Sequence, residues 1–130
     1  MQLTKEAILQ AEDLVIEKVT VPQWNGDVFI RVMSASARDK FDKGNLSKTD
    51  DGYEANFDNV RARLVCLTAC DEKGNPIFNN GDAEQLGLKN GEAVDLLAQV
   101  ARWLNKLDKK DVEEAIKNSE PGQSEGSTSA

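Results

Sequence analysis

Residues 14–33, LVIEKVTVPQWNGDVFIRVM, contain two runs rich in β-branched residues on either side of a turn. Apolar and polar positions alternate within these runs, as they do in strands that bury one face. Asn25-Gly26 is a strong signal for a tight hairpin turn, because both residues readily adopt a positive φ. We therefore expect a β-hairpin with arms at about 16–22 and 28–33.

A two-stranded hairpin is marginally stable alone, so helices must pack against one of its faces. Residues 3–14 carry apolar residues at helical spacing, with Thr4 as the N-cap. Residues 57–70, FDNVRARLVCLTAC, become almost wholly apolar after the second arginine, with Asp58 or Asn59 as the cap, and we expect them to form the central buried helix. Its expected buried stripe consists of Val60, Leu64 and Leu67.

The segment after the hairpin also has the features of a helix. Residues 34–43, SASARDKFDK, follow a cap at Ser34 or Ser36 and stop at Gly44. The next stretch, residues 44–56, is polar and rich in turn-forming residues. We expect that stretch to be a surface loop.

A longer amphipathic helix is predicted at residues 91–107, where apolar residues recur every three or four positions at Ala93, Leu97, Val100, Leu104 and Leu107, with Leu96 and Trp103 widening the stripe. Leu97 and Trp103 both fit its buried stripe, so we expect both in the core. A short helical turn at 82–87, capped by Asp82, precedes it. The whole pattern predicts an α+β fold that is mainly helical, with an N-terminal β-hairpin packed on the helices.

Length and composition indicate one domain. The chain has 130 residues, of which 39% are hydrophobic, and this is enough for one modest core. We assign residues 1–118 to the domain, with a last helix at 108–118. The stretch at 119–130, SEPGQSEGSTSA, is polar and serine-rich, and we expect it to be a flexible C-terminal tail.

Charge narrows the class of partner. A net charge of -7 opposes unaided binding to nucleic acid or to an anionic membrane surface, so we expect protein partners. No stretch has the length and apolar character of a membrane span, and acids occupy the N-terminal region where a signal peptide would be apolar. These features predict a cytosolic protein.

Catalytic and metal sites are not predicted. The chain contains no histidine, which removes the commonest general base and the commonest zinc ligand. The loop 71–82 resembles a calcium loop in composition, but Lys73 and Pro76 occupy positions where that loop needs an oxygen ligand and a glycine. Cys66 and Cys70 would lie on one face of a helix as buried thiols, without a disulfide. We expect a protein that is not an enzyme and has no cofactor.

The order of segments resembles that of a known family. The junction VFIRVMSASARDKFD at 28–42, then DEKGNPIF at 71–78, DAEQLG at 82–87 and a helix ending in LNKL resemble the tail assembly chaperones of long-tailed bacteriophages with non-contractile tails. The particular similarity is to the short form found in lambda-like phages. It covers about residues 3–118.

This resemblance implies a role in the host cell cytoplasm during virion assembly. Chaperones of this family hold the tape measure protein before the tail tube forms, help to recruit major tail protein, and are absent from the mature virion. Many also have a longer form made by ribosomal frameshifting, so a frameshifted longer form of this chain is a further expected partner.

Four residues are our candidate contacts for a protein partner. Trp24 lies at the predicted hairpin tip, where it either folds back on the core or faces a partner, and Phe29 lies mid-strand, where it can face either side. A surplus apolar stripe on the 91–107 helix lies around Leu96 and Leu104. Homo-oligomers are also expected, through hairpin edges or this surplus stripe.

Two other classes of protein fit part of the pattern. A permanent small tail or head-joining component would share the size and composition, but it would be present in purified virions. An acidic mimic of DNA would use its carboxylates as phosphate surrogates, although 16 basic residues interspersed among the 23 acids spoil such an array.

Overall fold

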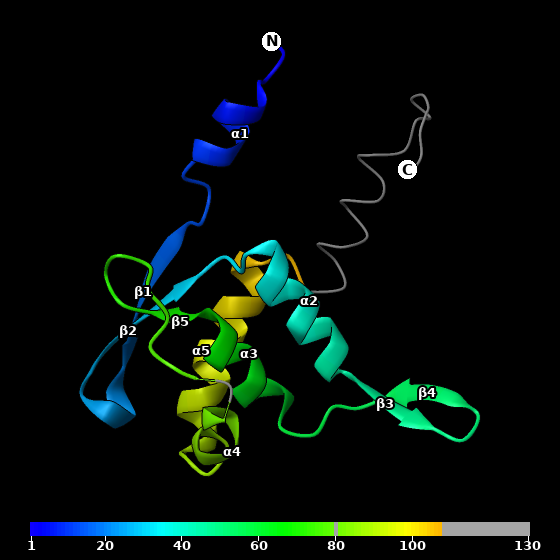
Figure 1. Cartoon of the computed structure of the whole chain (residues 1–130). Coiled ribbons are helices and arrows are strands. Elements are labelled where there is room, and N and C mark those ends of the chain that lie inside the picture. The colour runs from blue at the N-terminus through cyan, green and yellow to red at the C-terminus, as the bar shows by residue number, and fades with distance from the viewer. Residues whose placement is uncertain (80, 108–130) are drawn as a thin grey trace, which may run out of the picture.

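The computed structural model of the chain describes residues 1–79 and 81–107. Within that part it confirms the α+β class: the chain forms five α-helices, a three-stranded sheet and a separate two-stranded hairpin that projects to one side (Figure 1). The helix expected at 108–118 and the tail expected at 119–130 lie outside the described residues.

The N-terminal hairpin is confirmed as two antiparallel strands, β1 (Ile16–Val21) and β2 (Gly26–Arg31). The sheet order is β1-β2-β5, and the third strand, β5 (Ala69–Cys70), pairs with Phe29 and Ile30. Strand β2 is therefore central. The sequence did not predict β5, because two residues directly after a helix carry no alternating pattern of their own.

The hairpin turn differs from the predicted Asn25-Gly26 turn. Val21 pairs with Gly26, so the strands are joined by a short 3-10 helix, η1 (Pro22–Trp24), and Asn25. Proline at the first helical position has its φ preset for a helical turn. Asn25 then takes the left-handed conformation, with φ 53°, and its N–H bonds to the carbonyl of Pro22.

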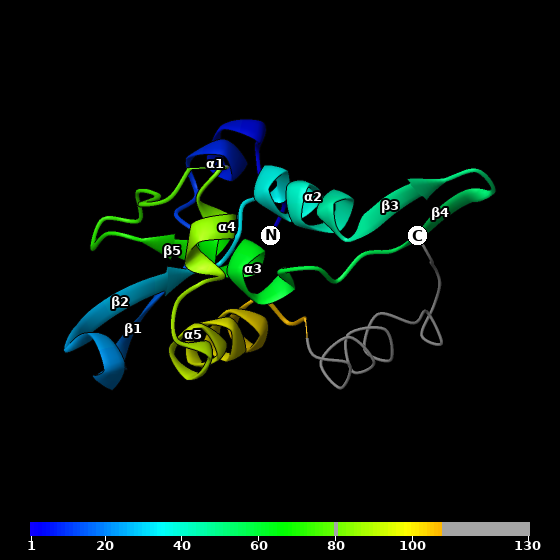
Figure 2. The same cartoon turned by 90° about the horizontal axis from the view of Figure 1, so that it is seen from below.

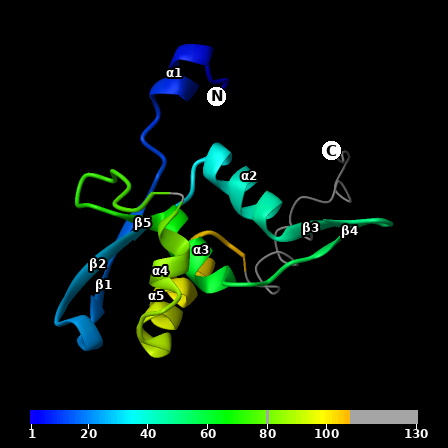
Figure 3. The same cartoon turned by 60° about the horizontal axis from the view of Figure 1, so that its bottom comes forward.

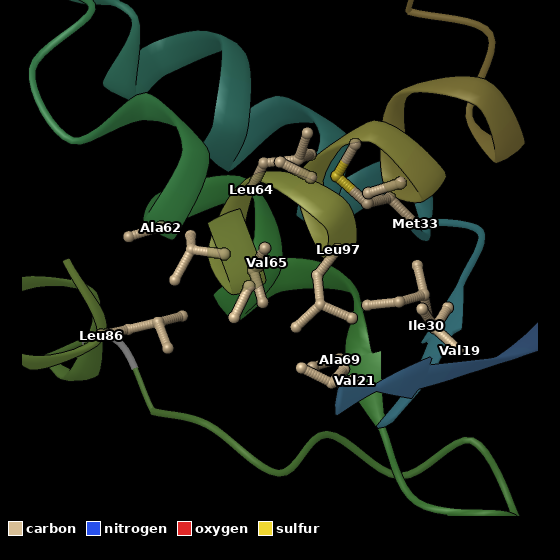
Figure 4. Packing of buried hydrophobic residues seen from close by; sticks show 14 of the residues in the cluster. Val19, Val21, Ile30, Met33, Ala62, Leu64, Val65, Ala69, Leu86 and Leu97 are labelled. Carbon is tan, nitrogen blue, oxygen red and sulfur yellow. The ribbon is translucent and has the colours of Figure 1, made fainter. Parts of the chain in front are cut away.

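The core lies between the sheet and α5 (Gly91–Leu104), which runs along the inner face of the hairpin (Figures 1 and 2). In Figure 4 the side chains of Val21, Ile30 and Leu97 point into one cluster together with Leu64 and Val65 from α3 (Val60–Thr68). None of these five is more than 2% exposed. Burial of this apolar area is the main force that holds the hairpin to the helices.

The buried stripe of α5 is rotated from the predicted one. Its buried residues are Ala93, Val94, Leu97, Ala98 and Ala101, so Leu97 is confirmed as core. Trp103 is 55% exposed, and its prediction as a core residue was wrong. Alanines let the helix approach the sheet and α3 closely, whereas an indole would not fit on that side.

Helix α3 is confirmed as the central helix, since it contacts α2 (Ala35–Gly44), α4 (Asp82–Leu86), α5 and β2. It begins after Asn59, whose side chain bonds to the carbonyl of Ala83 instead of capping its own helix. The chain leaves the helix at Ala69 and enters β5. Cys66 and Cys70 therefore do not share a helical face as predicted, and both are free thiols.

The prediction of a surface loop at residues 44–56 is wrong. This segment forms a second hairpin, β3 (Leu46–Thr49) and β4 (Gly52–Ala55), which projects from the end of α2 (Figures 2 and 3). A two-residue loop joins the strands. Gly52, the first residue of β4, has a φ of 130°, which glycine adopts readily because it lacks a Cβ atom. The sequence signal was weak because most of the strand residues are polar and no face is buried.

The guanidinium of Arg63 in α3 anchors the base of this second hairpin. Its three nitrogens donate to the carbonyl of Asp58 at 3.1 Å, the side chain of Asn45 at 2.9 Å and the carbonyl of Asn56 at 3.1 Å. The fork geometry of arginine allows all three bonds at once. The main role of Arg63 is therefore to hold the second hairpin against α3.

Side-chain caps start two further helices where the sequence placed them. In α1 (Lys5–Gln10) the hydroxyl of Thr4 accepts the N–H of Ala7 at 3.1 Å. In α2 (Ala35–Gly44) the hydroxyl of Ser34 accepts the N–H of Ala37 at 3.1 Å, which decides between Ser34 and Ser36. Both are the expected bonds of an N-cap.

The short helix α4 (Asp82–Leu86) begins differently from the prediction. Gly81 is its N-cap, and Asp82 is the first helical residue. The carboxylate of Asp82 accepts the backbone N–H of Asn79 at 2.7 Å and so closes the turn before the helix. The helix packs on α3, with Leu86 in the core.

Candidate protein-binding surfaces

The four predicted contact residues do not form one surface. Phe29 lies beside Ile30 on β2, and because neighbouring strand residues face opposite sides, it points away from α5. There it lines a shallow hollow with Cys70 and the 71–77 loop. Leu96 and Leu104 lie instead on α5, half-buried against the core. These two groups belong to different faces of the molecule.

Trp24 is 36% exposed in η1, which contacts α5. Trp24 therefore neither folds back completely onto the core nor faces solvent completely. Part of the indole is covered, and part is open to solvent. Of the four predicted residues, Trp24, Leu96 and Leu104 lie on or against the same helix.

A partly exposed stripe runs along α5 beside its buried one. Leu96, Val100, Trp103 and Leu104 form this α5 stripe, at spacings of three and four that place residues on one side of a helix. Leu96, Val100 and Leu104 pack partly on the core, and Trp103 is the most exposed of the four. Trp103 was not among the predicted contact residues, although its spacing from Leu96 and Val100 is the signal that could have placed it on this stripe.

A groove of about 370 Å³ lies between α2, α3, α4 and residues 76–79. Ala37, Phe41, Leu67 and Phe78 are among the residues that give it an apolar lining. Three cations also line it, namely Arg31, Lys40 and Arg63, and none of its lining residues is an acid. A basic groove in a chain of net charge -7 is a local exception to the overall charge.

Two of these cations hold the walls of the groove in place. Arg63 anchors the second hairpin, as described above. Arg31 donates to the carbonyl of Gly74 at 2.9 Å, which ties the 71–77 loop to the sheet, and its Nε is buried without a hydrogen-bond partner among the described residues. Lys40 is exposed on α2. It is the cation most open to an external acidic group.

Cys66 also lines the groove, so the rate at which its thiol is alkylated measures the environment inside the groove. Burial, together with the nearby carboxylate of Asp82, raises the pKa of Cys66 from 9.0 to about 11. Only the thiolate reacts with alkylating agents. Folding therefore keeps this thiol protonated and slow to react at neutral pH.

We expect the alkylation rate of Cys66 in the folded Cys70→Ala variant to rise about tenfold per pH unit between pH 8 and 10. In guanidinium the rate should level off near pH 9, the ordinary thiol pKa. The same shift makes folding stability fall as pH rises from about 9 towards 11, because the folded state favours the protonated thiol. A folded-state rate that levels off near pH 9 would contradict this pKa.

Residues 71–75 form a tight turn, in which the N–H of Gly74 also bonds to the carbonyl of Asp71 at 3.0 Å. Asp71 accepts the backbone N–H groups of Lys73 at 2.8 Å and Asn75 at 2.9 Å, and the bond from Asn75 is the largest cause of its lowered pKa. Its carboxylate is thus used within the turn. Throughout residues 1–79 and 81–107, no group of three side chains is placed to hold a metal ion. No helix in that part of the chain is long and apolar enough to cross a bilayer.

Comparison with known proteins agrees with this architecture. The family described as phage tail assembly chaperone matches residues 4–118. Among solved structures, the tail assembly chaperone of bacteriophage HK97 shares the fold, with a TM-score of 0.55 and 20% sequence identity over 76% of this chain and 94% of that chain. No curated protein sequence matches the chain.

Proposed function

The chain belongs to the phage tail assembly chaperone family, and on that premise we propose that its client is the tape measure protein of its own phage. Members of this family are non-enzymatic chaperones of phage tail assembly. The chain would hold the apolar helices of the tape measure protein in solution, help to recruit major tail protein and leave before the virion is complete. It would act in the host cell cytoplasm, without nucleic acid, membrane or cofactor.

The observation that carries this proposal is the exposure of Trp103 at the end of the α5 stripe. Helix α5 has 14 residues and is therefore about 21 Å long, enough to lie along several turns of a client helix. Amphipathic helices commonly bind through anchors at i, i+3, i+4 and i+7, which pack against such a stripe. We assign Trp103, Leu96 and Leu104 to this contact.

Trp24 extends the same contact, because η1 lies against α5. Tryptophan is enriched among the residues that dominate binding energy, since it offers a large apolar area at low entropic cost. Phe29 faces the other side of the sheet and stays a separate candidate contact. The net charge of -7 would keep a complex of apolar helices from aggregating.

Affinity capture tests the proposal. The chain is co-expressed with the tape measure protein of its phage and captured in low salt and in about 1 M salt, where exposed charge pairs are screened within about 3 Å. We expect the complex to survive high salt because apolar burial holds it. Loss of capture in high salt would contradict an apolar contact. Absence of capture at both salt concentrations would rule out the tape measure protein as the client.

A gel of purified virions tests whether the chain leaves the particle. We expect no band for it, and a stoichiometric band would instead indicate a permanent tail component. The frameshifted longer form stays a prediction, which mass spectrometry of infected cells would test through a peptide that spans the frameshift.

A further inference from the structure

The basic groove between α2, α3 and α4 holds cations without counter-ions. Arg31, Lys40 and Arg63 line it, and within the described part of the chain none of them forms an ion pair with a carboxylate. Asp82, at the start of α4, is not part of the lining, and its carboxylate accepts the N–H of Asn79. A partly enclosed cation is less well solvated than a free one, so a carboxylate ligand is favoured there.

Arg31 also brings a hydrogen-bond donor without an acceptor to the groove. Its Nη1 donates to the carbonyl of Gly74 at 2.9 Å, but its Nε is buried and has no partner among residues 1–79 and 81–107. Buried donors in folded proteins nearly always have an acceptor. A ligand that brings carboxylate oxygens to this guanidinium would supply one.

Apolar side chains form much of the remaining lining. Ala37 and Phe41 lie one turn apart on α2, and Leu67 from α3 and Phe78 also line the groove. Its volume of about 370 Å³ is near the lower end of the range for ligand pockets, so it admits a few side chains and not a whole folded surface. Cations around an apolar contact select a segment that carries both bulky apolar side chains and carboxylates.

The groove is separate from the α5 stripe. Among the described residues, none from α5 lines the groove. Helix α3 lies between the two surfaces, because it contacts α2 on one side and α5 on the other (Figures 2 and 3). A ligand in the groove would therefore leave the α5 stripe open.

We propose that this groove binds a short acidic segment of a second kind of protein, distinct from the helical client. The segment carries two bulky apolar side chains one helical turn apart, which pack against Phe41 and Phe78, and carboxylates that face Lys40 and Arg31. Binding in the groove therefore weakens in salt, whereas the apolar contact at α5 does not. This inference does not depend on the identity of the client.

Fluorescence anisotropy with a designed peptide tests the proposal on the full-length chain. The probe is a blocked, fluorescein-labelled peptide of about a dozen residues, with two leucines one helical turn apart, glutamates beside them and alanines elsewhere. We expect saturable binding at about 0.05 M salt and tenfold or more weaker binding at about 0.5 M salt, because salt screens the cations. Two control peptides, with lysine for glutamate or serine for leucine, should each bind at least about tenfold more weakly.

Variants of the chain test the groove itself. Lys40→Glu should weaken binding of the acidic peptide by on the order of tenfold. Lys48→Glu is the matched control, because it changes the net charge equally and Lys48 is exposed on β3, outside the groove. Circular dichroism should show that both variants stay folded, since neither lysine is buried. Phe78→Ala should weaken binding at both salt concentrations, because it removes apolar contact.

Cys66 shows where the peptide binds. Because Cys66 lines the groove, the acidic peptide should slow its alkylation several-fold in the folded Cys70→Ala variant at about pH 9. The peptide with lysine in place of glutamate should leave the rate unchanged.

Four results would each overturn the proposal. They are no binding of the acidic peptide in low salt, equal binding of the peptide with serine in place of leucine, equal effects of Lys40→Glu and Lys48→Glu, and protection of Cys66 that chain concentration alone produces. The last result would mean that a copy of the chain fills the groove. Because these experiments use no tape measure protein, their failure leaves the proposed client untouched.

Discussion

Leu97→Ala should lower the free energy of unfolding by about 2–5 kcal/mol, the usual cost of removing a fully buried leucine side chain. Leu97 is 1% exposed and lies where α5 meets the sheet and α3, so the cavity would be surrounded by core on every side. For a domain of this size, Tm should fall by on the order of 10 °C. Chemical denaturation followed by circular dichroism measures the effect.

Leu96→Ala is the matched control for this change, since the two leucines are neighbours on one helix. Leu96 is only half-buried, so we expect a loss of about 1 kcal/mol or less. Equal losses for the two variants would contradict the orientation of α5 described above.

Trp103→Ala should weaken binding of the tape measure protein by roughly 30-fold or more, as expected for a tryptophan that dominates an interface. The free chain should lose little stability, because Trp103 is 55% exposed. Affinity capture with titrated client measures the binding, and thermal unfolding measures the stability.

Tyr53→Ala provides the aromatic control for that experiment. Tyr53 is 70% exposed on β4, in the second hairpin and away from α5. We expect this variant to bind the client as the unaltered chain does. Equal losses of client binding in Trp103→Ala and Tyr53→Ala would rule out α5 as the surface that binds the client.

Local signals in the sequence predicted those elements that local chemistry determines. Alternating β-branched residues specified β1 and β2, and the side-chain caps Thr4 and Ser34 specified the starts of α1 and α2. The apolar run at 57–70 likewise predicted the central helix α3. In each case one short stretch contains the whole physical cause.

Elements that depend on tertiary contacts were not predictable in this way. The strand β5 exists because β2 offers it a free edge, and β3 and β4 are held at their base by Arg63 from a distant helix. The rotation of the α5 stripe follows from close packing of alanines against the sheet, which periodicity alone does not reveal.

The candidate sites follow the same division. Leu96 and Leu104 could be found from their spacing on one helix, whereas Trp103 was assigned to the core because spacing does not distinguish a buried side from a neighbouring exposed one. The basic groove could not be foreseen, since Arg31, Lys40 and Arg63 come from three different elements. Only the fold brings them to one place.

The most direct test of the central claim is the soluble fraction of the tape measure protein when it is expressed with and without this chain. We predict that the client is largely insoluble alone and moves into the soluble fraction with the chain, but much less so with the Trp103→Ala variant. A client that remains insoluble in the presence of folded, soluble chain would contradict the proposed role.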